Sequence, residues 1–298
     1  MTGLYTTGPR IDDTRVHAFV EAALGPYRLV RERSWAHGES RVWEVLAGPA
    51  TFYVKRHARQ HKFEQEWRAY RDWVPVLEAA APRLIAVSGT ESGVMILSAL
   101  PGEVASTLSL GAAQEAAVFQ AAGQHLRRFH DLPHQDPDPA SVYLNLHRKL
   151  DKWTALATGL VDARAINWVA AEVGTLLAVP GLLQVPCHGD FTPRNWLVNC
   201  SGTERAGPKL DVGIIDFEHA EPGLWLQDLS RLWSQVWPGR PELEAAFFSG
   251  YGRPLSAPDL RLLTSLCALD ALATVVWARQ HGDAAFEAQG HRVLKRLC

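Results

Sequence analysis

The sequence predicts an α+β fold in which a small sheet comes first and a larger, mainly helical region follows. Short runs of alternating apolar and polar residues, typical of half-buried strands, occupy residues 27–98. From residue 112 to residue 297, apolar residues recur mainly at helical spacing. A predicted strand hairpin at 196–215 interrupts these helices. With 298 residues, the chain can bury a sizeable core as one large domain or as two lobes.

The composition excludes several classes of protein. A hydrophobic fraction of 47% and a charged fraction of 21% are those of a soluble globular protein. A net charge of -2 and the lack of a long basic run argue against a nucleic-acid partner. We expect no membrane association, because no signal peptide opens the chain and no apolar run reaches the roughly 18 residues that span a bilayer. The four cysteines lack metal-ligand spacing, which indicates reduced thiols and a cytoplasmic location.

The N-terminal part of the chain predicts one sheet and two helices. Apolar residues at 11–24 follow the spacing of an amphipathic helix, which Gly25-Pro26 ends. A second helix is expected over 60–79, where Pro75 kinks or ends it. Period-two alternation indicates five strands, at 27–33, 41–46, 51–55, 83–87 and 93–98. Together these strands predict a five-stranded antiparallel sheet.

Beyond Pro101-Gly102, a natural domain boundary, the chain is mainly helical. Helical spacing marks six segments, at 112–132, 142–157, 162–178, 238–252, 258–281 and 283–297. A further helix is expected to begin at Asp228 and to carry Leu229, Leu232, Trp233 and Val236. The segment at 258–281 is apolar almost all round, so we expect it to be buried. Residues 218–223 are expected to form a loop. His125 and His130 lie on an apolar helix face, which predicts hydrogen-bonded core residues.

The chemistry-bearing stretch is the nonapeptide Cys-His-Gly-Asp-Phe-Thr-Pro-Arg-Asn that ends at Asn195, with Asp216 downstream. Strands predicted at 196–198 and 210–215 form an antiparallel hairpin across a turn-rich loop. Asn195 starts the first strand and Asp216 ends the second, so both side chains are expected at one end of the ladder. A carboxylate and a neutral oxygen suit Mg²⁺, which keeps several waters. Asp190 then faces a substrate hydroxyl.

The spacing of His188, Asp190 and Asn195, with an aspartate downstream, resembles the H-x-D-x-x-x-x-N and D-x-x motifs of the aminoglycoside phosphotransferase family and its choline-kinase-like relatives. The resemblance implies the bilobal protein-kinase-like fold. It assigns an N-lobe at 1–98, a hinge at 99–103 and a helical C-lobe at 104–298. Asp228 either braces the catalytic loop, as the resemblance implies, or places a charge at a helix N-terminus.

The resemblance also implies a nucleotide site in the N-lobe. Lys55, at the end of a strand, matches the lysine that binds the α- and β-phosphates. Glu66 is the carboxylate expected to hold this lysine, and Glu64 is the alternative. Tyr53 stands where kinases usually carry a small or aliphatic residue that faces adenine, so it either narrows the pocket or stacks on the base.

Backbone groups are expected to make the other nucleotide contacts. Gly38 and Ser40 occupy the position of the family's phosphate loop, although this turn has fewer glycines than that loop. In the hinge, the Ser98 carbonyl and the Leu100 amide are expected to read adenine. Because backbone groups make these contacts, the sequence does not discriminate ATP from GTP.

These residues imply an ATP-dependent phosphotransferase that acts on a small-molecule hydroxyl. Asp216 and Asn195 hold Mg²⁺, while Asp190 orients the hydroxyl and takes its proton late. By family frequency the acceptor is an aminoglycoside or another antibiotic; a metabolic kinase of the choline, homoserine or sugar-amine type is the alternative. A cationic acceptor would find acidic residues near the motif, at Glu218, Glu221 and Asp228.

Two other readings remain open at the level of sequence. A pseudokinase that binds nucleotide and regulates a partner is disfavoured, because the lysine, both aspartates and the asparagine of the motifs are all present. A protein kinase is disfavoured by the lack of an Ala-Pro-Glu segment after Asp216. We expect a monomer or a homodimer.

Overall fold

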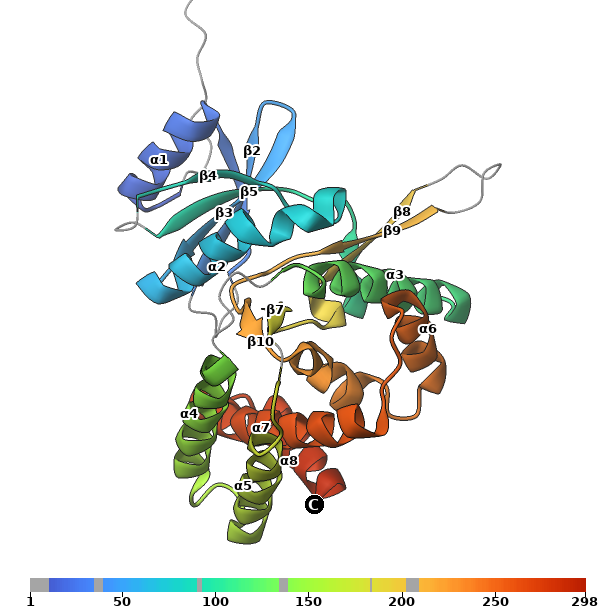
Figure 1. The fold of residues 1–298 in the computed structure, drawn as a ribbon. Coiled ribbons are helices and arrows are strands. Elements are labelled where there is room, and N and C mark those ends of the chain that lie inside the picture. The colour runs from blue at the N-terminus through green and yellow to red at the C-terminus, as the bar shows by residue number, and fades with distance from the viewer. Residues whose placement is uncertain (1–10, 35–39, 90–92, 134–138, 183, 202–208) are drawn as a thin grey trace, which may run out of the picture. The chain divides into compact units, whose positions relative to one another are not determined.

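The computed structural model describes residues 11–34, 40–89, 93–133, 139–182, 184–201 and 209–298. The chain forms two compact units, drawn in Figure 1. Unit 1 contains Met1–Thr107 and Trp196–Ala220, and unit 2 contains Leu108–Asn195 and Glu221–Cys298. Unit 1 holds the predicted five-stranded sheet and unit 2 is mainly helical, so the α+β class is confirmed. The lobe boundaries inferred from the sequence remain a proposal.

The sheet of unit 1 is antiparallel, with strand order β1-β2-β3-β5-β4. Its strands are β1 (Arg28–Glu32), β2 (Ser40–Ala47), β3 (Ala50–His57), β4 (Leu84–Val87) and β5 (Val94–Ser98). Lys55 on β3 is paired with Val42 on one side and with Met95 on the other. The central strand therefore carries Lys55, and two flanking strands fix its backbone.

Two helices accompany this sheet. Helix α1 (Thr14–Leu24) begins at Asp13, whose carboxylate accepts hydrogen bonds from two backbone amides of the first turn. Helix α2 (Gln60–Asp72) ends earlier than the predicted 60–79, and a 3₁₀ helix, η1 (Val74–Ala80), follows. Pro75 explains the early end, because its ring clashes with the carbonyl four residues before it and disfavours helical backbone at the preceding residue.

The predicted hairpin is present in unit 1. Strand β8 (Trp196–Ser201) pairs antiparallel with β9 (Lys209–Ile214), and Trp196 lies opposite Ile214. A short strand that the sequence did not indicate, β6 (Glu103–Val104), pairs with β8, and the 3₁₀ helix η2 (Ala105–Thr107) follows it. The chain thus returns to the hairpin directly after the expected hinge.

Unit 2 consists mainly of helices. They are α3 (Ala112–His130), α4 (Pro139–Ala157), α5 (Ala163–Leu177), α6 (Pro241–Tyr251), α7 (Ala257–His281) and α8 (Ala284–Leu297). Helix α7 is long and apolar enough to cross a membrane, but most of its apolar window is buried inside the protein. Leu263, Leu272 and Val275 on this helix are completely buried, so its composition suits a core helix.

The sequence predicted the irregular elements of unit 2 only in part. Residues 221–223, expected as a loop, form β10 (Glu221–Gly223), which pairs antiparallel with β7 (Val185–Cys187). Between these strands in the chain lies a 3₁₀ helix, η3 (Pro193–Asn195), and both strands and η3 are too short to show a periodic pattern. Where one helix is expected from Asp228, the chain forms a 3₁₀ helix, η4 (Trp225–Leu229), followed by a π-helix, η5 (Leu232–Val236).

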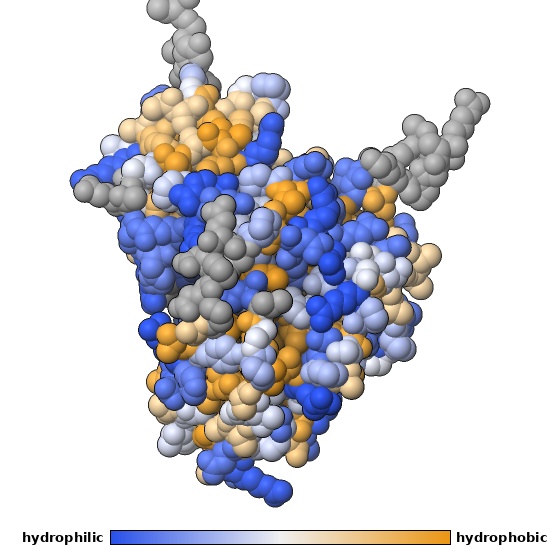
Figure 2. All heavy atoms as spheres, in the orientation of Figure 1, coloured by the Kyte–Doolittle hydropathy of each residue, from blue (hydrophilic) through white to orange (hydrophobic). Residues whose placement is uncertain are grey.

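Large hydrophobic residues at the surface are few among the described residues and only partly exposed. They are Val30, Ile85, Leu144, Leu156 and Leu260, with exposed fractions between 38% and 52%. On the face drawn in Figure 2, hydrophobic residues lie among hydrophilic ones in both units. Scattered surface hydrophobic residues of this kind are normal for a soluble domain.

Helices α3 and α6 approach each other closely at a glycine, which generates a stability prediction. A Cβ added at Gly250 would lie 1.9 Å from the Gln120 carbonyl oxygen. Gly250→Ala should therefore destabilise the protein by about 1–3 kcal/mol through overpacking. Gly174 in α5 has nothing within 4 Å of an added Cβ, so Gly174→Ala should stabilise the protein by roughly 0.4–1 kcal/mol. Urea denaturation of both variants measures the contrast, and equal effects would contradict the close helix contact.

Candidate active site

The side chain of Lys55 lies at the centre of an ion cluster within unit 1. Its Nζ atom is 3.0 Å from Glu66 Oε2, 2.7 Å from Asp216 Oδ1 and 2.9 Å from Glu218 Oε2. Strand β3 supplies Lys55, and helix α2 supplies Glu66. Glu64, the alternative partner, instead accepts a hydrogen bond from Gln60 on the exposed side of the helix. The structure thus brings Lys55 together with Glu66, and adds Glu218 to the group.

The electrostatics of this cluster fix Lys55 as a cation. Burial disfavours the charged ammonium, but the carboxylates of Asp216, Glu66 and Glu218 outweigh burial and raise the pKa of Lys55 well above its usual value. Burial also opposes ionisation of Glu218, yet Lys55 lowers the pKa of that carboxyl below its usual value. Three carboxylates thus face one ammonium, and this surplus of negative charge suits a divalent cation.

His57 is a member of this cluster that the sequence analysis missed. Its Nε2 atom lies 2.5 Å from Glu66 Oε2, and its Nδ1 atom lies 3.2 Å from the Gly93 carbonyl oxygen. Glu66 is therefore held by His57 on one side and by Lys55 on the other. The available signal was the period of two, which puts His57 on the same face of β3 as Lys55.

The backbone of Asp216 adopts a conformation that non-glycine residues rarely show. Its φ is +66°, and among the described non-glycine residues only Glu78 shares a positive φ. The next residue, Phe217, is completely buried and packs edge-on against Tyr70 of α2 at a ring distance of 5.5 Å. This packing holds the turn after β9. Strained backbone of this kind occurs preferentially at functional sites.

The other residues of unit 1 that the sequence places at the nucleotide site are Ser40, Gly38, Ser98 and Leu100. Ser40, at the start of β2, donates from its hydroxyl to Glu218 Oε2 at 3.0 Å, so it contacts the carboxylate cluster. Gly38 lies outside the described residues. The Ser98 amide donates to the Arg83 carbonyl, and the Leu100 side chain lies against Gly213 of the hairpin. The structure therefore joins Ser40 to Lys55 through their common partner Glu218, and leaves the roles of Ser98 and Leu100 as predictions.

Within unit 2, Asp190 is buried and hydrogen-bonded at both carboxylate oxygens. Arg231 Nη1 donates to Oδ1 at 2.5 Å, while Arg194 Nη2 and Asn195 Nδ2 donate to Oδ2 at 2.5 and 2.8 Å. The same Asn195 Nδ2 atom also donates to the backbone carbonyl oxygen of Asp190 at 2.9 Å. Burial opposes ionisation, but the two arginines outweigh it and lower the pKa of Asp190 below its usual value. The sequence analysis had assigned no role to either arginine.

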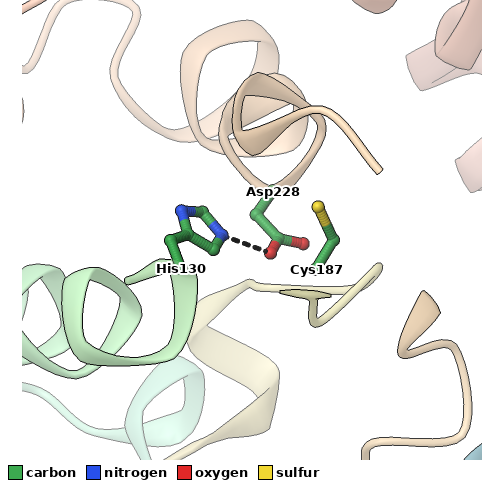
Figure 3. A group of neighbouring side chains, drawn as sticks. All are labelled: His130, Cys187 and Asp228. Atoms are coloured by element: carbon green, nitrogen blue, oxygen red, sulfur yellow. Dashed lines mark hydrogen bonds and ion pairs between the residues drawn. The ribbon is translucent and has the colours of Figure 1, made fainter. Parts of the chain in front are cut away.

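A buried carboxylate holds the loop that carries Asp190. Asp228 on η4 accepts the backbone amides of His188 and Gly189, each at 2.7 Å. It also accepts from His130 Nε2 at 3.0 Å, and Figure 3 shows this imidazole directed at the Asp228 carboxylate. His130 Nδ1 lies 2.8 Å from the Tyr251 hydroxyl. Of the two readings of Asp228, the contacts favour the brace over a charge at a helix end.

Cys187 lies beside His130 and Asp228, and these three side chains have the kinds of ligand atoms that bind metal ions (Figure 3). Its thiol lies 3.3 Å from the Leu224 carbonyl, and burial raises its pKa well above the usual value. Both oxygens of Asp228 already accept hydrogen bonds. The group is therefore a structural support of the loop.

The three acidic residues that could attract a cationic acceptor all have other partners. Glu218 contacts Lys55 and Asp228 contacts His130. Glu221 lies 2.7 Å from Lys149. Each carboxylate thus already contacts a side chain of its own unit.

Comparison with known proteins identifies a family. A family model described as "Phosphotransferase enzyme family" matches residues 33–263. A protein of Deinococcus radiodurans, described as uncharacterized, is 33% identical over 166 residues, which cover 50% of this chain. The match covers 46% of that relative, so it spans about half the length of the curated protein.

Solved structures share the fold across most of the chain. The GDP and kanamycin complex of APH(2")-IIia is similar with a TM-score of 0.70 and 14% identity, over 96% of this chain and 98% of that one. Plasmodium vivax ethanolamine kinase has a TM-score of 0.64 and 14% identity, over 95% and 85% of the two chains. Macrolide 2'-phosphotransferase type I has a TM-score of 0.63 and 17% identity, over 97% and 99%. Identities this low show the fold alone.

The bracing role of Asp228 generates a stability prediction. Asp228→Asn replaces a charged acceptor of three donors by an amide that accepts at one atom only, so we expect a loss of about 3 kcal/mol or more in the free energy of unfolding. Asp131→Asn is the control, because Asp131 is an exposed carboxylate paired with Arg127 and should cost no more than about 0.5 kcal/mol. Chemical denaturation compares the two variants. Equal, small losses would show that Asp228 does not support the loop.

Proposed function

Because the chain belongs to the phosphotransferase enzyme family, we propose that it moves the γ-phosphate of ATP to a hydroxyl of a small molecule. The observation that carries this proposal is the buried Lys55, fixed between Glu66 and Asp216 in unit 1. An ammonium held in this way can bind the α- and β-phosphates of a nucleotide without moving. GTP is a second candidate donor, since the similar APH(2")-IIia was crystallised with GDP.

The carboxylate cluster of unit 1 fits Mg²⁺, which neutralises phosphate charge when it is bound. Asp216 offers a carboxylate that is 39% exposed, in a cluster with surplus negative charge. Asn195 offers its amide oxygen, since its amide nitrogen already donates to Asp190. We propose these two residues as metal ligands, as their sequence motifs imply.

Asp190 is the proposed residue for the acceptor. The hydroxyl oxygen forms a bond to the γ-phosphorus while the bond from that phosphorus to the ADP oxygen breaks. The hydroxyl proton passes late to Asp190, so the carboxylate mainly orients the acceptor. His188 supports this loop, because its Nδ1 accepts the Asp190 amide at 3.2 Å. Asp228 fixes the same loop from behind, which leaves the Asp190 side chain in a defined position.

For the acceptor we propose a chemical class and not a single compound. An aminoglycoside or another antibiotic is one candidate, supported by the similar kanamycin complex of APH(2")-IIia and by the similar macrolide 2'-phosphotransferase. A metabolic acceptor of the choline, homoserine or sugar-amine type is the second candidate, and the similar ethanolamine kinase of Plasmodium vivax supports it. We further propose a cytoplasmic enzyme that is a monomer or a homodimer.

The role of Lys55 is tested by nucleotide affinity. Lys55→Ala should weaken Mg-ATP binding by about tenfold or more, because a fixed charge on the phosphates is lost. Glu66→Gln should produce a milder loss of the same kind, since Lys55 keeps two other carboxylates. Glu64→Gln, on the exposed side of α2, is the matched control and should bind as wild type does. Calorimetric titration measures all three, and a Glu64→Gln defect that exceeds that of Glu66→Gln would reverse the assignment.

The catalytic assignment is tested by acceptor-dependent ADP release from a panel of antibiotics and metabolic hydroxyl compounds. Asp190→Asn should lower kcat by roughly 10²-fold, the low end for a positioned base, and leave Mg-ATP affinity within about tenfold. Normal turnover of Asp190→Asn would show that the Asp190 carboxylate has no role in the reaction.

Asp216→Ala should abolish Mg-dependent turnover while the protein stays folded. A wild type that binds Mg-ATP but uses no acceptor would favour a pseudokinase.

A further inference from the structure

The surroundings of Asp190 carry information about the charge of the acceptor. A carboxylate has two oxygens and about four acceptor positions. Here Arg231 occupies Oδ1, and Arg194 and Asn195 occupy Oδ2. A hydroxyl that donates to Asp190 therefore approaches a carboxylate whose charge two guanidinium groups already share.

The two arginines differ in how exposed their side chains are. Arg231 has a side chain that is 25% exposed, and its Nε atom also lies 3.6 Å from a second carboxylate, Asp270 on α7. Arg194 lies on the short 3₁₀ helix η3, and its side chain is 46% exposed. An incoming ligand can thus turn Arg194 with less loss of packing than Arg231. Arg194 is the guanidinium that can bind the ligand.

The two guanidinium groups at Asp190 disfavour a cationic ligand. Arg194 and Arg231 both lie against the carboxylate that the acceptor hydroxyl must reach. A cationic ligand would therefore meet like charges at the point where its hydroxyl docks, and such a contact opposes binding. Glu221, another carboxylate of the same unit, is paired with Lys149.

An anionic ligand would find a suitable partner at the same place. A guanidinium presents paired N–H donors whose spacing matches the oxygens of a carboxylate or a phosphate. When a hydroxyl takes one acceptor position of Asp190, Arg194 can move its donors to an anionic group on the same molecule. Arg231 and Asn195 then continue to hold Asp190.

We propose that the acceptor is a small hydroxyl compound with an anionic group, a carboxylate or a phosphate, and that Arg194 binds this group beside Asp190. This inference rests on the proposed phosphotransferase function. It deepens that function by assigning Arg194 as a specificity-determining residue. It also places polycationic antibiotics among the poor substrates.

The test compares small probes matched in size but not in charge. ADP release is measured with Mg-ATP and glycolate, 3-hydroxypropionate or glycerol 3-phosphate, against ethanolamine and choline. Kanamycin is added as a larger polycation outside the size-matched set. A thermal shift with a non-hydrolysable ATP analogue reports binding of each probe without turnover. Wild type should prefer at least one anionic probe over its cationic counterpart by about tenfold or more in kcat/KM or in binding. Comparison of the hydroxy acids with glycerol 3-phosphate tells a carboxylate from a phosphate.

Variants of Arg194 separate this proposal from a general charge effect. Arg194→Gln should reduce the anion preference to about threefold or less, and Arg194→Glu should reverse it in favour of the cations. Arg279→Gln is the matched control, because Arg279 is an exposed arginine paired with Glu287 on α8 and should keep the wild-type preference. Mg-ATP affinity is measured on every variant.

Three results would overturn the assignment of Arg194. They are a wild-type preference for cationic probes, an anion preference that survives Arg194→Gln, and a lack of response to every anionic probe. Each of these leaves the phosphotransferase function standing as long as Mg-ATP binds. Failure of the wild-type protein to bind Mg-ATP would instead contradict the proposed function itself.

Discussion

The burial of the Lys55 ammonium is the constraint on which unit 1 depends. A buried charge costs several kcal/mol unless partners replace its water. Lys55 has three carboxylate partners, and they come from helix α2 and from the turn after the hairpin. The sheet, the helix and the hairpin must therefore keep their mutual positions for this ammonium to stay compensated. The left-handed backbone at Asp216 is tolerated because that position aims its carboxylate at Lys55.

In unit 2 the buried charge that needs partners is negative, the carboxylate of Asp228. Asp228 is compensated mainly by backbone amides of His188 and Gly189, so its partner is a loop and not a side chain. Loop backbone seldom lies buried without partners, because its polar groups need hydrogen bonds. The Asp228 carboxylate meets that need and holds the segment that leads to Asp190. Fixing a loop through its backbone leaves the side chain of Asp190 available for chemistry.

The sequence predicted the periodic elements well and the irregular ones poorly. The five-stranded sheet and the hairpin follow from alternation, and the six helices of unit 2 from helical spacing, all with boundary shifts of a few residues. The pairing of β7 with β10 joins segments far apart in the chain that are too short for a pattern. Lys55 and Glu66 could be paired from motif and helix register. The period of two could have placed His57 on the same face as Lys55, but its contact with Glu66 arises only in the folded chain. The role of Arg231 could not be predicted, because it lies far from Asp190 in the sequence.

The two groups of charges differ in balance, and this difference fits the two substrates of a phosphotransferase. In unit 1, carboxylates outnumber the ammonium they surround, so a polyphosphate gains from arriving with a divalent cation of its own. At Asp190 in unit 2, two guanidinium groups share one carboxylate, and one of these guanidinium groups is half exposed. A half-exposed guanidinium can turn to an anion that reaches it. The proposed Mg-nucleotide is therefore consistent with the first group, and the proposed anionic acceptor with the second.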